Sequence, residues 1–311
     1  MNMKTCCGGF GLLNVDLLYS GLPRFPQEGE EIFADAFSLQ LGGGVAATLI
    51  GLRRLGVPAE LHTFIGSDLF STFAASSLER FHIPVFNYYD GSEIPVNISS
   101  AIITKRDRSI VSYNGVPSGD AALPDWLWPR MLERFSGYRL VEMQPYAPDF
   151  YRELHRRGVT LVLDTGWSDE LSLEKFADYL EIADYYTPNE KEALKLTGCS
   201  SVEAAACVLE PYFKSVVVKQ GAEGCLLREN GVNRFIQVLP NVQAVDATGA
   251  GDAFLSGFLY GLYHNYSVTD AVQFGNICGG FCVSSVGCLG ADIDESLLLE
   301  TWRDVYHRSV D

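Results

Sequence analysis

The chain has 311 residues, of which 47% are hydrophobic and 20% charged, a composition typical of a soluble globular protein with one large α/β domain or two smaller domains. Its formal net charge of −16 argues against nucleic acid or an anionic membrane as a partner, because both are bound through basic patches. The amino-terminal apolar run is interrupted by glycines and too short to span a bilayer. It also makes a poor signal peptide, so we expect a cytoplasmic protein.

The eight cysteines form neither a disulfide framework nor a CxxC pair. Cys278, Cys282 and Cys288 are close in sequence, but their apolar neighbours are typical of a helix core. We therefore interpret them as buried thiols rather than as metal ligands.

The first predicted strand covers residues 6–13 and is followed by two polar residues, Asn14 and Asp16. Alternate residues that leave a strand point the same way, and ligands of open α/β sheets bind beyond the carboxyl ends of the strands. Asn14 and Asp16 are therefore candidates for binding a hydroxyl-rich ligand, with a simple turn as the alternative.

A glycine run, Gly42 to Gly44, precedes a predicted helix that ends at Gly56. Glycines at a helix start permit close approach of the backbone to a ligand. The run is therefore a second candidate for ligand binding.

Two stretches have β-like patterns without alternating helices: residues 30–41, and residues 96–113 with a charged turn at 105–108. They predict a small antiparallel sheet laid over a larger α/β body, formed from about residues 15–41 and 90–119. We call this sheet the lid, because such a cover would exclude water from a site beneath it.

From residue 139 onward, apolar strands alternate with helical segments, which is the pattern of a parallel sheet with right-handed crossovers. Asp164 ends one predicted strand, and Glu142 and Gln144 stand at the end of another. Each of the latter two is either a substrate contact or a turn-forming residue. The strands are predicted at residues 140–143, 160–163, 185–187 and 215–218.

A helix is predicted to begin near Asn189 with acidic residues in its first turn, which the helix dipole alone would favour. Asn189 and Glu192 are three residues apart and so share a helix face. The functional interpretation is a pair that holds a hydrated Mg²⁺ ion. Further along, the strand that ends near Lys219 breaks into a turn that contains Gly221 and Gly224.

Residues 245–254 are predicted to form a turn with small side chains that opens onto a helix, since the following apolar residues recur at helical spacing. Free backbone N–H groups and the positive end of the helix dipole make such a turn an anion site, here at Gly249, Ala250 and Gly251. Asp252 at its mouth is well placed to accept a proton, with helix capping as the alternative.

The string DATGAGDAF, residues 246–254, closely resembles the carboxyl-terminal signature of the PfkB (ribokinase-like) family of carbohydrate and nucleoside kinases. The glycine run and the Asn189 to Glu192 pattern resemble further family motifs and occur in the family's order. The resemblance implies a ribokinase-like three-layer α/β/α fold with a mostly parallel central sheet and a small β-sheet lid. It also implies ATP-dependent phosphorylation of a hydroxymethyl group on a sugar or sugar-like substrate.

The resemblance makes Asp252 the base, and it makes the backbone of Gly249, Ala250 and Gly251 the anion hole for the transferring phosphoryl group. The implied cofactors are ATP and Mg²⁺, with K⁺ in some relatives. The other implied roles are sugar binding by Asn14, Asp16, Gly42, Gly43 and Gly44; nucleotide binding by Lys219, Gly221, Gly224, Thr248 and Asn276; magnesium binding by Asn189 and Glu192; and a monovalent-cation loop that includes Asp246.

One departure from the family pattern leaves the acceptor open, because Ala47 occupies the position where many members carry a substrate-binding Asn. A nucleoside kinase is the main alternative, and an aromatic platform in the lid, from Phe33, Phe37 and Tyr113, would favour it. A catalytically silent ligand-binding relative is the second alternative, against which the intact Asp252 argues. An exposed edge of the lid is a candidate contact for a homodimer.

Overall fold

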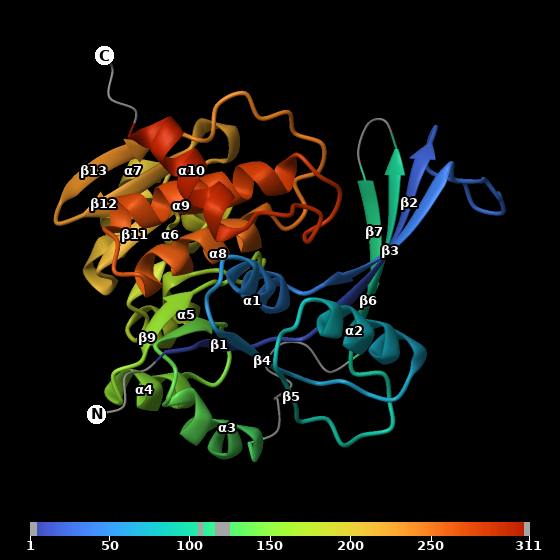
Figure 1. Ribbon diagram of the computed structural model, residues 1–311, viewed down its shortest axis with the longest axis horizontal. Helices are drawn as coiled ribbons and strands as arrows, with labels where there is room; N and C mark the ends of the chain where they lie inside the picture. Colours follow the sequence, from blue (N-terminus) through green and yellow to red (C-terminus); the bar gives the residue numbers. More distant parts are fainter. Residues whose placement is uncertain (1–4, 105–107, 116–124, 308–311) are drawn as a thin grey trace.

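The computed structural model describes residues 5–104, 108–115 and 125–307, which form a large layered body and a small sheet that projects from one side of it (Figure 1). The central sheet of the body consists of β1 (Cys7–Phe10), β4 (Ala59–Thr63), β5 (Val85–Asn87), β8 (Leu140–Met143), β9 (Thr160–Leu163), β10 (Tyr185–Tyr186), β11 (Ser215–Lys219), β12 (Cys225–Glu229) and β13 (Val232–Ile236).

The strands of this sheet lie in the order β13-β12-β11-β10-β9-β8-β1-β4-β5. Neighbours from β5 to β11 pair in parallel, and β12 pairs antiparallel with both β11 and β13. The predicted mostly parallel sheet is therefore confirmed. The antiparallel hairpin at its edge, β12 and β13, is an addition that the sequence patterns did not predict.

Helices cover both faces of the sheet, which confirms the predicted three-layer fold (Figure 1). One face packs against α1 (Gly44–Arg54), α2 (Leu69–Arg80), α8 (Ala250–Tyr263), α9 (Val268–Val283) and α10 (Glu295–Tyr306). The other face packs against α3 (Leu127–Phe135), α4 (Pro148–Arg156), α5 (Leu173–Leu180), α6 (Glu190–Thr197) and α7 (Val202–Leu209).

The parallel strands are mainly apolar because both of their faces are buried, with polar exceptions such as His62 in β4 and Glu142 in β8. In β11, Val217 packs into the core on the side of α8 and α9, whereas Val216 and Val218 pack into the core on the other side. Cys278 and Cys282 are buried in α9, as predicted. None of the helices in the described ranges is long and apolar enough to cross a membrane.

The lid is a sheet of mixed pairing that contains β2 (Asn14–Leu22), β3 (Ala36–Gly42), β6 (Asn97–Thr104) and β7 (Arg108–Tyr113). The pairs β2–β3 and β6–β7 are antiparallel as predicted, but β2 and β6 run parallel, so the prediction of a purely antiparallel sheet was wrong. A parallel pair is possible because the chain passes through the body between these two strands. The predicted turn at 105–107 and the end of the predicted lid at 116–119 lie outside the described residues.

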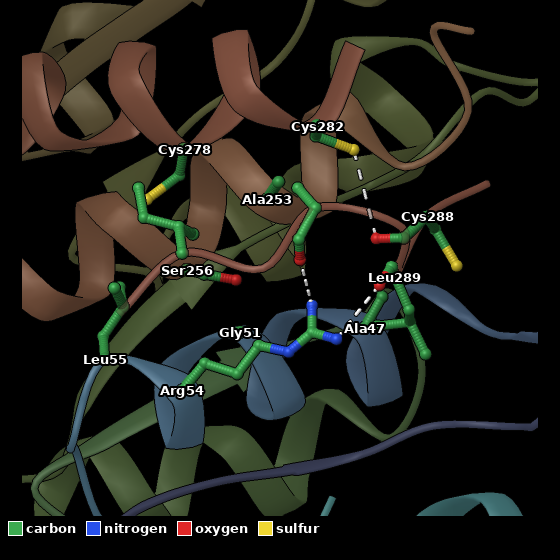
Figure 2. Close-up of a pocket in the computed structure, with 12 residues that line it drawn as sticks. Ala47, Gly51, Arg54, Leu55, Ala253, Ser256, Cys278, Cys282, Cys288 and Leu289 are labelled. Carbon is green, nitrogen blue, oxygen red and sulfur yellow. Dashed lines mark hydrogen bonds between the residues drawn. The ribbon is translucent and has the colours of Figure 1, made fainter. Parts of the chain in front are cut away.

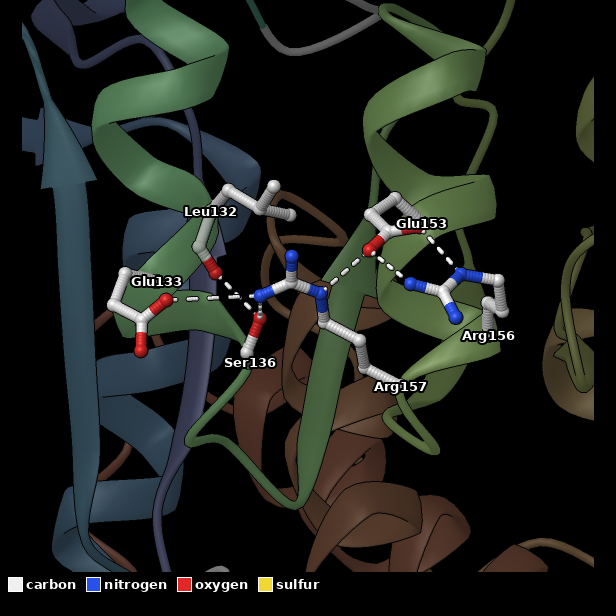
Figure 3. Close-up of polar contacts among 6 residues, drawn as sticks. All are labelled: Leu132, Glu133, Ser136, Glu153, Arg156 and Arg157. Atoms are coloured by element: carbon white, nitrogen blue, oxygen red, sulfur yellow. Dashed lines mark hydrogen bonds and ion pairs between the residues drawn. The ribbon is translucent and has the colours of Figure 1, made fainter.

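Ion pairs at the surface join the ends of α3 and α4 (Figure 3). The Arg157 guanidinium contacts Glu153 at 2.7 Å and Glu133 at 3.7 Å, and it donates to Ser136 Oγ at 3.0 Å. The Glu153 carboxylate also accepts from Arg156, and these two arginines lower the pKa of Glu153 to about 2. Because the groups are largely solvent-exposed, we assign them a minor role in stability and none in the site.

The buried histidine of β4, His62, is held neutral by its surroundings. Its ring nitrogens lie 2.9 Å from Tyr88 Oη and 2.6 Å from Tyr138 Oη, and Phe86 stacks on the ring. Burial, and secondarily the charge of Arg134, lowers the pKa of His62 to about 3. In the unfolded chain the same side chain titrates near its ordinary value of about 6.5.

We predict that His62 makes folding sensitive to acid. As the pH falls below about 6.5, the unfolded chain gains a proton that the folded chain does not bind, so stability is lost until the pH approaches 3. Between pH 7.5 and pH 5 this linkage amounts to about 2 kcal/mol. Urea unfolding at both pH values should show that His62→Gln loses less stability on acidification than the wild type by about that amount. His307→Gln, a change at a half-exposed histidine, should keep the wild-type difference; equal differences for both variants would contradict the assignment.

Candidate active site

The turn into α8 has a backbone conformation that only glycine adopts readily. Gly249 precedes the first residue of α8 and has φ of +76°, in the left-handed region. A Cβ atom added there would also overlap Cβ of Cys288, which packs against the turn. No side-chain cap is possible at Gly249, which cannot occupy the N–H groups of the first turn of α8. The N–H of Ala250 donates to Ala247 O at 3.3 Å. The anion hole at Gly249, Ala250 and Gly251 stays a prediction.

The carboxylate of Asp252 stands in this first turn without a hydrogen-bond partner among the described residues. The alternative interpretation of Asp252 as a helix cap is therefore not supported. A Cβ atom added to Gly44 would lie 3.1 Å from Asp252 Oδ1, so the glycine run before α1 borders this carboxylate. Burial and the charge of Asp164 raise the pKa of Asp252 to about 7, against the opposing effect of Lys219.

Lys219 brings a positive charge to the same turn. A Cβ atom added to Gly251 would lie 3.4 Å from Lys219 Nζ, and this amine lies 5.7 Å from the ring centre of Phe254. The backbone of Lys219 pairs with the start of α6, since its N–H donates to Pro188 O at 2.8 Å and it forms a bridge with Asn189. Lys219 therefore contacts the first residues of both α6 and α8.

Asn189 and Glu192 form a reciprocal cap at the start of α6. Asn189 Oδ1 accepts from the N–H of Glu192 at 3.0 Å, and Glu192 Oε2 accepts from the N–H of Asn189 at 2.8 Å. Burial raises the pKa of Glu192, and the charge of Asp164 adds to this effect, while the Asn189 N–H and Lys219 oppose it. The pair thus has a structural role in addition to the metal role that its spacing suggested.

Glu142, for which the sequence left a substrate contact and a turn former as alternatives, is a buried acid inside β8. Its side chain is 1% exposed, Oε1 accepts from Gln144 Nε2 at 3.1 Å, and Oε2 has no partner. Burial raises the pKa of Glu142 well above its usual range, and the charges of Asp164 and Asp252 add to this effect. The sequence signal for a buried acid is that Glu142 is the one charged residue in the apolar strand β8.

The predicted sugar-binding residues come together at the base of the lid. Asn14 and Asp16 open β2 rather than follow the end of a strand, and Asn14 Nδ2 donates to Asp16 Oδ1 at 2.5 Å. A Cβ atom added to Gly42 would lie 2.5 Å from Asp16 Oδ2. Gly42 and Gly44 are two residues apart, at most ~7 Å. Because Gly42 borders Asp16 and Gly44 borders Asp252, the glycine run brings both carboxylates to the same part of the molecule.

Gly43, between them, has φ of +107° and would place a Cβ atom 2.7 Å from Leu12 O, so this position also requires glycine. The charges of Asp252 and Asp16 both act on the buried Cys288 thiol and, after burial itself, help to raise its pKa to about 12. This supports the placement of both carboxylates around one site.

Asp246 joins two loops at the rear of the site. Its Oδ1 accepts from the N–H of Thr248 at 2.9 Å and from Thr248 Oγ1 at 2.7 Å, and its Oδ2 accepts from the N–H of Gly287 at 2.9 Å. The Asp246 side chain therefore fixes the loop before α8 to the loop after α9. A cation at this loop would be held through backbone oxygens, as the resemblance implied.

The remaining predicted nucleotide residues lie along the edge formed by β12, β13 and α9. Asn276 is buried, donates to Gln237 O at 2.9 Å and accepts from Cys225 Sγ at 3.1 Å, so it has a clear structural role. Gly224 has φ of +103° and lies against Ile236 O, which the β12–β13 pairing requires. Gly221 has open space around it.

Ala47, at the position where many family members carry a substrate-binding Asn, is buried in α1. It lines a small cavity of about 30 Å³ between α1 and the loop after α9, together with Cys288 and Leu289 (Figure 2). Arg54 closes one side of this cavity and donates to Leu289 O at 3.0 Å. Because residue 47 is alanine rather than asparagine, it contributes only a methyl group to the lining of this cavity.

Comparisons with known proteins identify the family and the fold. A family profile described as "pfkB family carbohydrate kinase" matches residues 10–294. The chain is 27% identical to the ribokinase of Haemophilus influenzae, over 92% of this chain and 94% of that protein. It is 26% identical to the 2-dehydro-3-deoxygluconokinase of Bacillus subtilis, over 81% of this chain and 83% of that protein. The structure of Arabidopsis thaliana ribokinase in complex with ribose and ATP superposes with a TM-score of 0.81 at 24% identity, over 97% of this chain and 99% of that chain.

The family match spans nearly the whole chain, including both the lid and the turn into α8. The relatives named above are kinases by description, and the solved ribokinase has the same three-layer fold. The chain therefore belongs to the PfkB family of carbohydrate kinases.

Proposed function

We propose that this protein is an ATP-dependent kinase that phosphorylates a hydroxymethyl group of a sugar or sugar-like substrate. The observation that carries the proposal is the unpartnered Asp252 carboxylate, whose pKa is near 7, in a helix turn bordered by Lys219 and by the glycine run before α1. A carboxylate of this pKa accepts a proton from a hydroxyl group at neutral pH.

In the proposed mechanism, Asp252 accepts the proton of the attacking hydroxyl group. The backbone N–H groups of Gly249, Ala250 and Gly251 stabilise negative charge on the transferring group, and Lys219 adds a cation at the same place. Bound ATP supplies the phosphoryl group, and Mg²⁺ neutralises charge on its phosphates. Asn14 and Asp16 orient the substrate through its other hydroxyl groups, with the backbone of Gly42 to Gly44 close to it.

Glu142 has a proposed role in binding the substrate. Burial raises its pKa well above its usual range and so favours the protonated form, which can donate a hydrogen bond to a substrate hydroxyl group. The unpartnered Oε2 is the atom that is free to do so.

The residues at the start of α6 fit a magnesium ion held mainly by water and phosphate. In the described ranges, no group of three or more His, Cys, Asp or Glu side chains is arranged to hold a metal by itself. Mg²⁺ commonly uses only one or two protein carboxylates together with waters and substrate phosphates. Glu192 and Asn189 would bind it through water. Asp164 lies nearby, since its charge contributes to the raised pKa of Glu192.

The nucleotide is proposed to extend from Lys219 past Gly221, Gly224 and Thr248 toward Asn276. The open space at Gly221 and the position of Lys219 beside Gly251 support the phosphate end of this path. At Asn276 the support is weaker, because its amide already bonds Gln237 and Cys225. A K⁺ ion at the Asp246 loop remains part of the proposal.

The aromatic platform in the lid that would favour a nucleoside kinase is not supported. Strand register places Phe37 and Tyr113 on the face of the lid opposite Asp16, because Phe37 pairs with Tyr19 and Tyr113 pairs with Ile98. Phe33 is 80% exposed. These aromatic residues therefore do not form a platform above the site, although a nucleoside acceptor is included in the tests below.

The outer face of the lid is the proposed contact of a homodimer. Its large side chains are unusually exposed for apolar residues, and contiguous apolar patches on soluble proteins commonly mark interfaces. The pairing of β2 with β3 and of β6 with β7 gathers them on one face: Tyr19, Phe37, Leu39, Val111 and Tyr113.

We predict that Asp252→Asn lowers kcat by at least about 10³-fold, because the amide cannot accept the proton, while the affinity for ATP changes little. Coupled ATP-consumption assays and nucleotide titrations measure the two quantities. In the wild type, kcat/KM should rise as the pH increases through about 7, since only the ionised carboxylate is active. Asp294→Asn, which preserves the cap of α10, is the matched control and should keep wild-type turnover. Undiminished turnover of Asp252→Asn would refute the assignment of the base.

We also predict that Asp252 reduces stability above neutral pH. Its folded pKa of about 7 exceeds the unfolded value, so the folded chain binds the extra proton at low pH. This stabilisation is complete below the unfolded pKa of about 4 and is lost as the pH rises through about 7. Asp252→Asn should therefore be more stable than the wild type by about 4 kcal/mol at pH 8.5 and by only about 1.5 kcal/mol at pH 5. Denaturant unfolding at the two pH values measures this, and an equal effect at both would argue against a buried, ionising carboxylate.

Glu192→Gln separates the two roles of Glu192. Glutamine maintains the reciprocal cap but removes the negative charge. We expect an unchanged melting temperature together with a rise of about tenfold in the Mg²⁺ concentration needed for half-maximal activity. Ser201→Asn, a cap-preserving change at α7, controls for small effects on helix starts. A normal magnesium requirement in Glu192→Gln would show that the pair acts only as a cap.

A further inference from the structure

We infer that Gly51 and Ser256 are positioning residues, because their contact between α1 and α8 sets the distance from the glycine run to the Asp252 carboxylate. The inference rests on the proposed kinase function, since it concerns the base of that reaction. Gly51 stands in the interior of α1, where glycine is less favourable than alanine. A packing requirement at this position accounts for the glycine.

Gly51 allows the two helices to approach closely. A Cβ atom added to Gly51 would lie 2.8 Å from Ser256 Cβ and would overlap Ser256 Oγ. Both residues line the small cavity beside α1 (Figure 2). Rotation of the Ser256 side chain moves Oγ but not Cβ, so a larger residue at position 51 would push the helices apart.

The Ser256 hydroxyl group joins α1 to the backbone of the proposed base. Ser256 is 1% exposed, and its Oγ donates to Thr48 O in α1 and to Asp252 O in α8, each at 2.9 Å. Thr48 Oγ1, which is also buried, donates to Asp252 O at 3.5 Å. The main-chain carbonyl group of Asp252 is therefore held by side chains from both helices.

The faces of α1 and α8 that meet at this contact also meet at the base. Asp252 and Ser256 are four residues apart and share one face of α8. Gly44 and Gly51 are two helical turns apart and share one face of α1. A Cβ atom added to Gly44 would lie 3.1 Å from Asp252 Oδ1. A wider separation at Gly51 therefore moves the Asp252 carboxylate away from the glycine run.

This separation affects the rate more than it affects the binding of ATP. In the proposed mechanism the acceptor lies against the glycine run and gives its proton to Asp252, so the two helices carry the two reacting groups. A displacement of about 1 Å between reacting groups can lower a rate by about 100-fold. The proposed phosphate contacts at Gly249 to Gly251 are joined directly to Asp252 and move with it. We therefore expect kcat to depend on the contact more strongly than KM for ATP.

The first test is Gly51→Ala in the full-length protein. ATP-consumption assays use D-ribose, D-fructose, D-glucose, myo-inositol, D-gluconate and adenosine, and the acceptor with the highest wild-type kcat/KM serves for all variants. We expect kcat to fall at least fivefold, with KM for ATP within twofold of the wild type. A smaller loss of kcat, or an equal rise in KM for ATP, would overturn the inference and leave the kinase function standing. Wild-type turnover of no acceptor would refute the proposed function, and the inference with it.

Gly261→Ala is the matched control. Gly261 is nine residues after Asp252 in the same helix, ~13 Å along its axis, and a Cβ atom added there would lie 2.6 Å from Ala271 Cβ in α9. The variant therefore overfills a helix contact to a similar degree, but away from the glycine run. Both variants should lower the melting temperature, whereas only Gly51→Ala should lower kcat per folded molecule. Equal losses of kcat would show a general effect of packing, and the inference would fail.

A compensating change separates the position of Asp252 from general stability. Gly51→Ala combined with Ser256→Gly removes the atoms that the new methyl group meets, although it introduces another glycine within a helix. This double variant should recover at least threefold of the kcat that Gly51→Ala loses, without an equivalent recovery in melting temperature. A folded double variant with no recovery of kcat would contradict the inference.

Ser256→Ala tests the contact without overfilling it and decides the question if Gly51→Ala does not fold. It removes the two hydrogen bonds of Oγ and leaves the space at Gly51 open. We expect kcat to fall about threefold to fivefold, as for the loss of one or two hydrogen bonds, with KM for ATP unchanged. Wild-type kcat in Ser256→Ala would show that the hydroxyl group does not position the base.

Discussion

The first turn of α8 is the constraint on which the rest of the site depends. Gly249 must adopt a left-handed φ and must lack a side chain, because Cys288 packs directly against it. The same turn brings Gly251 close to the Lys219 amine and holds the Asp252 carboxylate. The anion binding and the proton acceptance that we propose would therefore both depend on one backbone conformation.

The concentration of negative charge around this turn is costly to the fold. Burial and the charge of Asp164 raise the pKa values of Glu142 and Asp252, Asp252 adds to the effect on Glu142, and Lys219 opposes the effect on Asp252. Such an arrangement is unfavourable for stability but suits a site that must hold an ionisable base near neutral pH. The two apolar cores on either side of the central sheet supply the stability that tolerates it.

The site is divided between two sheets, and their connection is short. The chain passes from β1 of the body to β2 of the lid within a few residues, so Asn14 and Asp16 stand where the lid begins. Gln40 of β3 packs against Gly287, whose N–H is bound by Asp246. The lid base is therefore in contact with the loop that Asp246 fastens to α8. The position of the lid and the geometry of the phosphate-binding turn are thereby physically connected.

Local patterns in the sequence determined the alternating strands and helices and the turn before α8. They also indicated the candidate roles of Asp252, Asn14 and Asp16. All of these features depend on residues that are close together in the chain. Tertiary structure decided what depends on distant contacts. Asn14 and Ser99 are 85 residues apart, and only the parallel pairing of β2 with β6 places them together. The pairing of β2 with β3 places Phe37 on the face of the lid opposite Asp16, and burial in β8 raises the pKa of Glu142 well above its usual range. Strand register and burial are set by packing across the whole domain, which no short stretch of sequence contains.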